Sequence, residues 1–148
     1  MGNVAVAVDV QGFYATAYPL PDLQGFVPII PTRALDTRSG VGAPKAPLGA
    51  QASLRVKVTG LGGVPVGASA VMVNLTGITP TVNTRLYAYG FIGAGISGYP
   101  TISLSPGQVR PVLAVLPVTS DGYITVFNAA GTIDVLADIQ GYYFDTRM

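Results

Sequence analysis

The residues whose types and spacing best suit chemistry are Arg33, Asp36 and Arg38, the densest charged cluster in a chain with only 10% charged residues. A carboxylate flanked by two arginines can belong to a ligand site or to a structural clasp of ion pairs and hydrogen bonds. The clasp is the favoured interpretation, because guanidinium and carboxylate groups match each other in a fixed geometry. An alternative partner of Asp36 is a distant arginine such as Arg110.

The residue types that most catalytic sites need are missing from the chain. It contains no His and no Cys, and all seven of its acidic residues are Asp. Ser-His-Asp and Cys-His arrangements and the usual zinc sites are therefore excluded. The aspartates lack the spacing of a calcium loop, and the glycine clusters lack the Lys-Ser/Thr of a phosphate loop. We predict a non-enzymatic protein with no catalytic residue, no metal site and no cofactor, although a glycosidase-like aspartate pair stays open.

Tyrosines are the other side chains with binding potential. The chain has eight of them, and Tyr87, Tyr89 and Tyr99 are the candidate glycan contacts. Exposed aromatic rings can stack on sugar rings, which would make cell-wall polysaccharide a partner. The favoured alternative is packing in the core or an interface with the hydroxyl at the rim.

Charge and hydropathy limit the other partners. The net charge is +1 without a basic run, so we expect no nucleic-acid binding. Gly, Pro or a polar residue interrupts every apolar run before the ~18 residues of a membrane helix, so we expect no membrane span. Residues 1–10 carry Asp9 and no basic leader, unlike a secretory signal. With 49% hydrophobic residues, some apolar surface should be buried against other copies of the chain.

The elements that position the charged cluster and the tyrosines are predicted to be strands. The 19 Gly and 12 Pro are spread along the chain between short runs rich in Val, Ile, Leu, Tyr and Thr, which is typical of short strands joined by turns. We predict a single all-β domain over 1–148, a sandwich or barrel of short, mostly antiparallel strands. The expected strands are 4–10, 54–58, 70–75, 85–89, 112–118, 123–127 and 133–139. Of these, 70–75 and 112–118 read as buried strands, the latter bounded by Pro111 and Pro117. Residues 128–132 read as a hairpin loop joining the last two strands, 17–31 as an extended Pro-rich connector, and 38–52 and 91–100 as loops.

The two ends of the chain repeat each other. Residues 2–14 match 131–143 at a constant offset, sharing the ending D-[VI]-Q-G-[FY]-Y. The repeat indicates either a duplication inside one domain, a tandem array in which residues 1–16 are the closing strand of a preceding unit, or an effect of where the given sequence begins. In the second case that strand can pair or be exchanged with a neighbouring copy. The residues of this assembly strand are Val4, Val6, Val8, Val10, Phe13 and Tyr14.

Three motifs resemble a β-rich repeat of secreted actinobacterial proteins. Residues 31–38, PTRALDTR, are similar to its P-T-R-L-L-D-T-R signature. Residues 64–76, VPVGASAVMVNLT, resemble V-P-x-G-A-x-A-V-x-x-N-V-T, and residues 138–143, DIQGYY, resemble D-V-x-G-Y-Y. Residues 101–105 depart from the S-N-L-N-like segment of that family. The resemblance, which covers about residues 29–143, implies an extracellular or cell-surface module that accompanies catalytic domains or stands in arrays.

The sequence therefore predicts an extracellular structural protein that self-assembles, as a fibre or surface-layer subunit, by pairing or swapping strands between copies. A carbohydrate- or cell-wall-binding module is the first alternative. A virion or phage-tail component is the second, because it would assemble in the same way.

Overall fold

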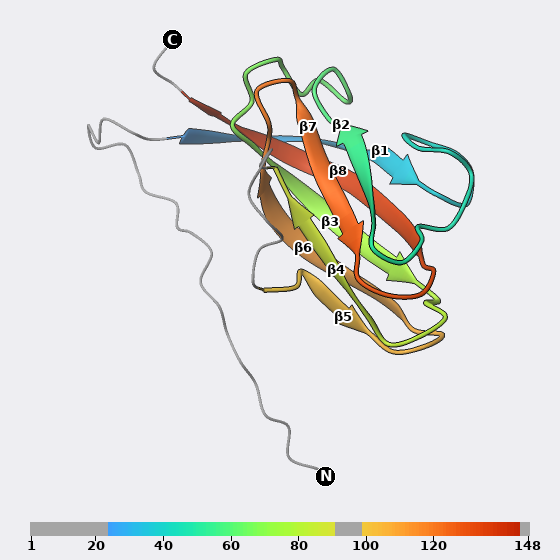
Figure 1. The fold of residues 1–148 in the computed structure, drawn as a ribbon. Coiled ribbons are helices and arrows are strands. Elements are labelled where there is room, and N and C mark those ends of the chain that lie inside the picture. The colour runs from blue at the N-terminus through green and yellow to red at the C-terminus, as the bar shows by residue number, and fades with distance from the viewer. Residues whose placement is uncertain (1–23, 91–98, 146–148) are drawn as a thin grey trace.

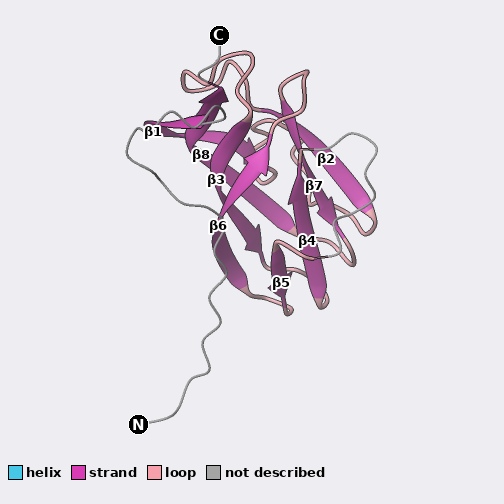
Figure 2. Cartoon of the chain, turned by 90° about the vertical axis from the view of Figure 1, so that its left-hand side faces the viewer, coloured by secondary structure: helices cyan, strands magenta, loops and turns pink. Residues whose placement is uncertain are grey.

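The structure is a computed structural model that describes residues 24–90 and 99–145 as a sandwich of two antiparallel sheets (Figure 1). The strands are β1 (Gln24–Asp36), β2 (Ala52–Lys57), β3 (Ala70–Ile78), β4 (Thr84–Tyr89), β5 (Ile102–Leu104), β6 (Val109–Pro117), β7 (Tyr123–Asn128) and β8 (Asp134–Asp145). The first sheet has the order β1-β8-β3-β6 and the second β2-β7-β4-β5. Figure 2 shows the two sheets as facing layers. The predicted all-β class is confirmed.

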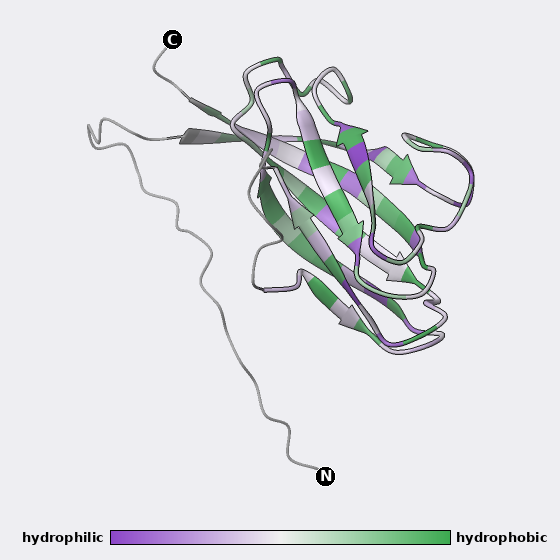
Figure 3. Cartoon of the chain, viewed as in Figure 1, coloured by the Kyte–Doolittle hydropathy of each residue, from purple (hydrophilic) through white to green (hydrophobic). Residues whose placement is uncertain are grey.

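The core lies between the two sheets and is built from alternate residues of each strand. In β3, Val71, Val73 and Leu75 are fully buried, whereas Met72 and Asn74 between them are only partly covered. This period of two is what a strand with one buried face requires. Hydrophobic residues recur in this way along both sheets (Figure 3). The second sheet contributes the fully buried side chains of Val56, Leu86, Ile124 and Val126.

One buried polar side chain fixes how the two sheets are joined. Asn128 ends β7 and is fully buried. Its Nδ2 donates to the carbonyl oxygens of Leu48 (3.1 Å), Gly49 (3.0 Å) and Gly131 (3.0 Å), and its Oδ1 accepts from Thr84 Oγ1 (2.6 Å). A buried amide with all of these partners holds the surrounding loops in one arrangement.

The predicted hairpin over residues 128–132 is wrong. β7 lies in the second sheet and β8 in the first, so this link crosses between the layers. The hydrogen bonds of Asn128 hold the start of the link against the loop at Leu48, and Leu48 forms an isolated bridge with Ile133 at its end. Spacing alone does not distinguish such a crossover from a hairpin loop.

The Pro-rich connector predicted over residues 17–31 is also wrong in part, since residues 24–31 belong to β1. β1 is an edge strand whose one partner among the described strands is β8, and its register shifts between Pro28 and Thr32. Proline is tolerated in such a strand because one side of its backbone needs no ladder hydrogen bonds. Residues 1–16, which contain the predicted assembly strand, and most of the 91–100 loop lie outside the described residues.

The prediction that residues 112–118 form a buried strand needs the same kind of correction. β6 runs from Val109 to Pro117, so Pro111 and Pro117 lie inside the strand, which is the other edge of the first sheet. Its buried residues alternate with exposed ones. In the described part of the chain, the structure has no helix with the length and apolar character that a membrane span needs.

Candidate functional site

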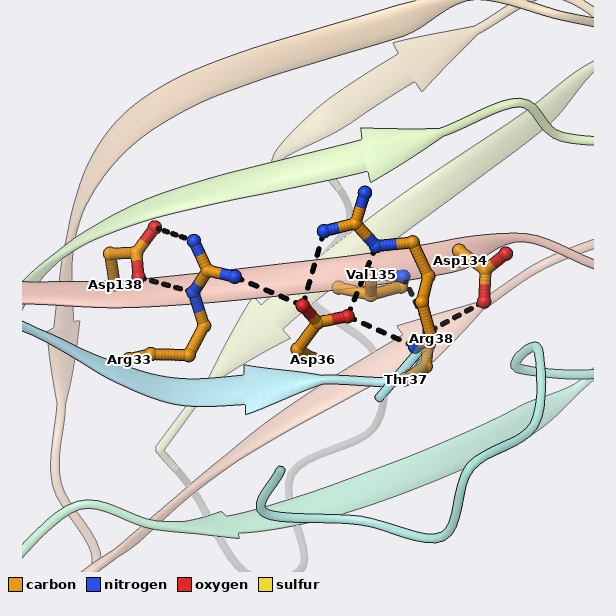
Figure 4. A network of polar contacts seen from close by, with 7 residues as sticks. All are labelled: Arg33, Asp36, Thr37, Arg38, Asp134, Val135 and Asp138. Atoms are coloured by element: carbon orange, nitrogen blue, oxygen red, sulfur yellow. Dashed lines mark hydrogen bonds and ion pairs between the residues drawn. The ribbon is translucent and has the colours of Figure 1, made fainter. Parts of the chain in front are cut away.

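The charged cluster Arg33, Asp36 and Arg38 comes together at the end of β1 (Figure 4). Arg38 donates to Asp36 through Nε (3.1 Å to Oδ1), Nη2 (3.1 Å to Oδ2) and its backbone N–H (3.0 Å to Oδ1). Arg33 Nη1 lies 3.0 Å from Asp36 Oδ2 on the other side. The carboxylate of Asp36 is thus held between two guanidinium groups, and we call these three residues the clasp.

Arg33 ties the clasp to β8. Its Nε lies 2.5 Å from Asp138 Oδ1 and its Nη2 3.2 Å from Asp138 Oδ2, which is a two-pronged contact between strands paired at this position. Asp138 lies within β8, directly opposite Arg33. The clasp uses this neighbour and not Arg110.

A second contact continues the clasp along β8. Thr37 Oγ1 donates to Asp134 Oδ1 (2.7 Å) and accepts from the backbone N–H of Val135 (3.0 Å). Thr37 is fully buried, so its hydroxyl replaces ladder hydrogen bonds where β1 leaves the sheet. Sequence reasoning missed Thr37, Asp134 and Asp138. The available signal was the place of Thr37 in the P-T-R-A-L-D-T-R motif and of Asp138 in the D-I-Q-G-Y-Y motif, whereas Asp134 lies in neither.

The clasp has the electrostatics of a structural site. The hydrogen bonds from Arg38, helped by the charge of Arg33, lower the pKa of the Asp36 carboxyl from 3.8 to about 2, although burial acts in the opposite direction. The hydrogen bond to Asp138 raises the pKa of the Arg33 guanidinium. A general base needs a pKa near the working pH, and this carboxyl has moved away from it. Asp36 is also only 6% exposed, and both of its carboxylate oxygens already accept hydrogen bonds from Arg33 and Arg38. The clasp therefore presents no open ligand site.

No family model matches the chain, and no curated protein matches it. The resemblance to the actinobacterial repeat therefore stays a prediction. Within residues 24–90 and 99–145, no group of three or more potential metal-ligating side chains lies together.

The candidate glycan contacts occupy two different surfaces. Tyr87 and Tyr89 alternate with Leu86, which is buried in the core, and Ala88, which packs against the core, so both tyrosines point outward from the second sheet. Tyr87 packs on Phe127, its partner across the sheet, with 6.0 Å between the ring centres. Tyr99 is 86% exposed and lines a separate hollow beside β6.

An exposed apolar strand edge lies at the opposite end of the first sheet from the clasp. Every outward-facing residue of β6 is apolar, and the set is Val109, Pro111, Leu113, Val115 and Pro117. Val109 is 60% exposed and Leu113 54% exposed. Among the described strands, β6 has one ladder partner, β3. The outward residues are thus the ones that another chain would meet.

Within residues 24–90 and 99–145, the backbone groups of β6 that the ladder with β3 does not use belong to these same outward residues. Val118 N donates to Ser69 O and Thr79 N to Gln108 O, one at each end of the ladder. Alternate residues of an antiparallel strand bond the same neighbour. The backbone N–H and C=O groups of even-numbered residues of β6 therefore point toward β3, and those of odd-numbered residues point away from it. Proline leaves no N–H at positions 111 and 117, so the donors available in the centre of the edge are Leu113 and Val115. The hollow bordered by Ala88 and Tyr99 runs along residues 112–117.

Proposed function

We propose that this chain is a non-enzymatic, extracellular structural protein whose copies assemble by β-strand pairing. In the proposed contact, the assembly strand of one copy, residues 4–14, adds to the β6 edge of another. In the proposed assembly the rotation between successive copies does not close a ring, so this head-to-tail contact extends into a fibre or a surface layer. The observation that carries the proposal is the apolar centre of the β6 edge, which no other described strand pairs with.

The repeat supports the choice of donor. The segment that residues 2–14 repeat is β8 with its preceding turn, and β8 pairs on both sides, with β1 and with β3. Its Gly141 lies so close beneath the Phe26 ring of β1 that a Cβ there would collide with the ring. A sequence of this type is suited to pairing with two neighbours, and residues 4–14 carry the same glycine as Gly12.

The other edges support the choice of acceptor. β2 presents Arg55 and Lys57 outward, and charged residues are a common protection against unwanted pairing. β5 has three residues, too few for a stable ladder. β1 is irregular, with register shifts on both sides of Arg33. β6 is nine residues long and pairs with β3 without a register shift. Its outward-facing side chains are apolar.

Placing charge on this edge should stop assembly. We expect the double substitution Leu113→Lys with Val115→Lys to shift the chain to a single-copy mass in size-exclusion chromatography with light scattering, because two ammonium groups would have to be desolvated in the contact. Both side chains face away from the core, so the melting temperature should stay close to that of the parent chain.

The matched control is Val66→Lys with Val82→Lys, which adds the same charge at apolar side chains that are 82% and 43% exposed away from β6. This control should assemble as the parent does. Equal assembly of both double variants would show that β6 is not the acceptor edge.

A further inference from the structure

A pair of arginines stands apart from the clasp and from the outward residues of β6. Arg85 on β4 and Arg110 on β6 line one shallow hollow at the end of the sandwich near β5. The other polar side chains of the hollow are Asn83, Thr84, Ser103, Ser105 and Gln108. None of its lining residues is acidic.

Both arginines lie beside Ser103. Arg110 Nη1 donates to the carbonyl oxygen of Ser103 at 3.0 Å, which fixes the guanidinium at the outer edge of β5. Arg85 lies directly opposite Ser103 in the ladder of β4 with β5. The short strand β5 therefore has one arginine on each side of it. A guanidinium has five N–H donors, so Arg110 keeps four after this bond.

Their charges are not neutralised within the described residues. The ion pairs there join Asp36, Asp138 and Asp121 to Arg33, Arg38 and Arg55. Neither Arg85 nor Arg110 takes part in one. In a chain with a net charge of +1, two unpaired guanidinium groups around one polar hollow are a local excess of positive charge.

We propose that this hollow binds the carboxylate or phosphate groups of an anionic glycan. Guanidinium groups bind both kinds of oxyanion through paired N–H donors. Arg85 and Tyr87 are alternate residues of β4 and face outward together, so a sugar attached to the bound anion can stack on the Tyr87 ring. The hydroxyl and amide side chains of Ser105 and Asn83 suit sugar hydroxyls. The inference goes beyond assembly and does not depend on it.

The test measures retardation of the full chain in native gels containing one of four probes. These are oligogalacturonate for the carboxylate, poly(glycerol phosphate) for the phosphate, a neutral xylo-oligosaccharide and a single-stranded DNA oligonucleotide. We expect at least one anionic glycan to retard the chain more than the neutral one. Which of the two does so identifies the anion.

Substitution of the arginines should remove this binding. Arg85→Gln and Arg110→Gln should each weaken binding of that glycan about tenfold, since each removes charge-assisted hydrogen bonds. Lys45→Gln changes the charge equally in the exposed 38–52 loop and should leave binding unchanged. The chain lacking residues 2–16 should bind as the full chain does, which separates this proposal from assembly.

Three results would overturn the proposal. The first is no retardation by either anionic glycan, and the second is equal retardation of the arginine variants and the Lys45 control. The third is tighter binding of the DNA oligonucleotide through the same arginines, which would assign the hollow to nucleic acid. Arg85 is exposed, so unchanged melting of its variant should accompany the measurement.

Discussion

A chain lacking residues 2–16 should remain a single copy at concentrations at which the full chain assembles. The truncation removes the proposed donor strand with Val4, Val6, Val8 and Val10 and leaves all eight described strands intact. The folded domain should therefore keep its circular dichroism spectrum and lose only its higher mass. Light scattering after size exclusion measures the change from a multiple of 15.2 kDa to a single truncated chain.

The control for truncation keeps the length and removes only the pairing. Val6→Pro with Val8→Pro takes away two backbone donors and bends the segment out of a regular strand. This variant should behave as the truncated chain does. Negative-stain images of full-length chain should show extended assemblies, and those of either variant should not. Assembly of the truncated chain to the same mass as the full chain would show that residues 4–14 are not the donor strand.

Asp36→Asn should lower the free energy of unfolding at neutral pH by about 2 kcal/mol, because it removes the charge that two arginines surround. The expected size follows from the lowered pKa of the Asp36 carboxyl, which falls from 3.8 to about 2. Arg33 and Arg38 are 40% and 49% exposed, so solvent screens part of the interaction. Urea unfolding of both proteins measures the difference.

The Asp36 carboxyl also determines how the free energy of unfolding changes with pH. Because the pKa of Asp36 is lower in the folded state, its contribution is complete above the unfolded pKa near 3.8 and is lost as the pH falls through about 2. The difference between the parent and Asp36→Asn should therefore shrink between pH 4 and pH 2. Asp121→Asn is the matched control, since Asp121 and its partner Arg55 are both 48% exposed and such pairs add little. Equal loss of unfolding free energy in the two variants would show that the clasp stabilises the fold no more than an exposed ion pair does.

The alternating strands were predictable from the sequence, and their assignment to sheets was not. The runs at 70–75, 85–89 and 123–127 each lie within a strand of the structure, and the run at 54–58 extends one residue beyond β2. They were predictable because a half-buried strand leaves its period of two in the residues themselves. β1 was hidden because Pro28 and Pro31 read as a connector, and they are tolerated only at a sheet edge. Whether 128–132 turns back or crosses over depends on Asn128 and its partners, which spacing does not reveal.

The candidate sites also contain contacts that were predictable from the sequence and contacts that were not. Arg33, Asp36 and Arg38 are neighbours in sequence, so their meeting was predictable from composition and spacing. Asp138 is 105 residues from Arg33, and the two meet only through the register of β1 with β8. Arg85 and Arg110 likewise line one hollow only because Ser103 of β5 pairs with Arg85 of β4 and accepts a hydrogen bond from Arg110 of β6. Contacts of this kind follow from strand order, which local patterns do not contain.

A photo-crosslink from residue 8 tests the central claim most directly. The chain with p-benzoylphenylalanine in place of Val8 is mixed with an isotope-labelled chain without it, irradiated, digested and analysed by mass spectrometry. Strand pairing between copies predicts crosslinks from the probe to labelled peptides containing residues 109–117. Crosslinks confined to the probe's own chain, or directed to strands other than β6, would contradict the account.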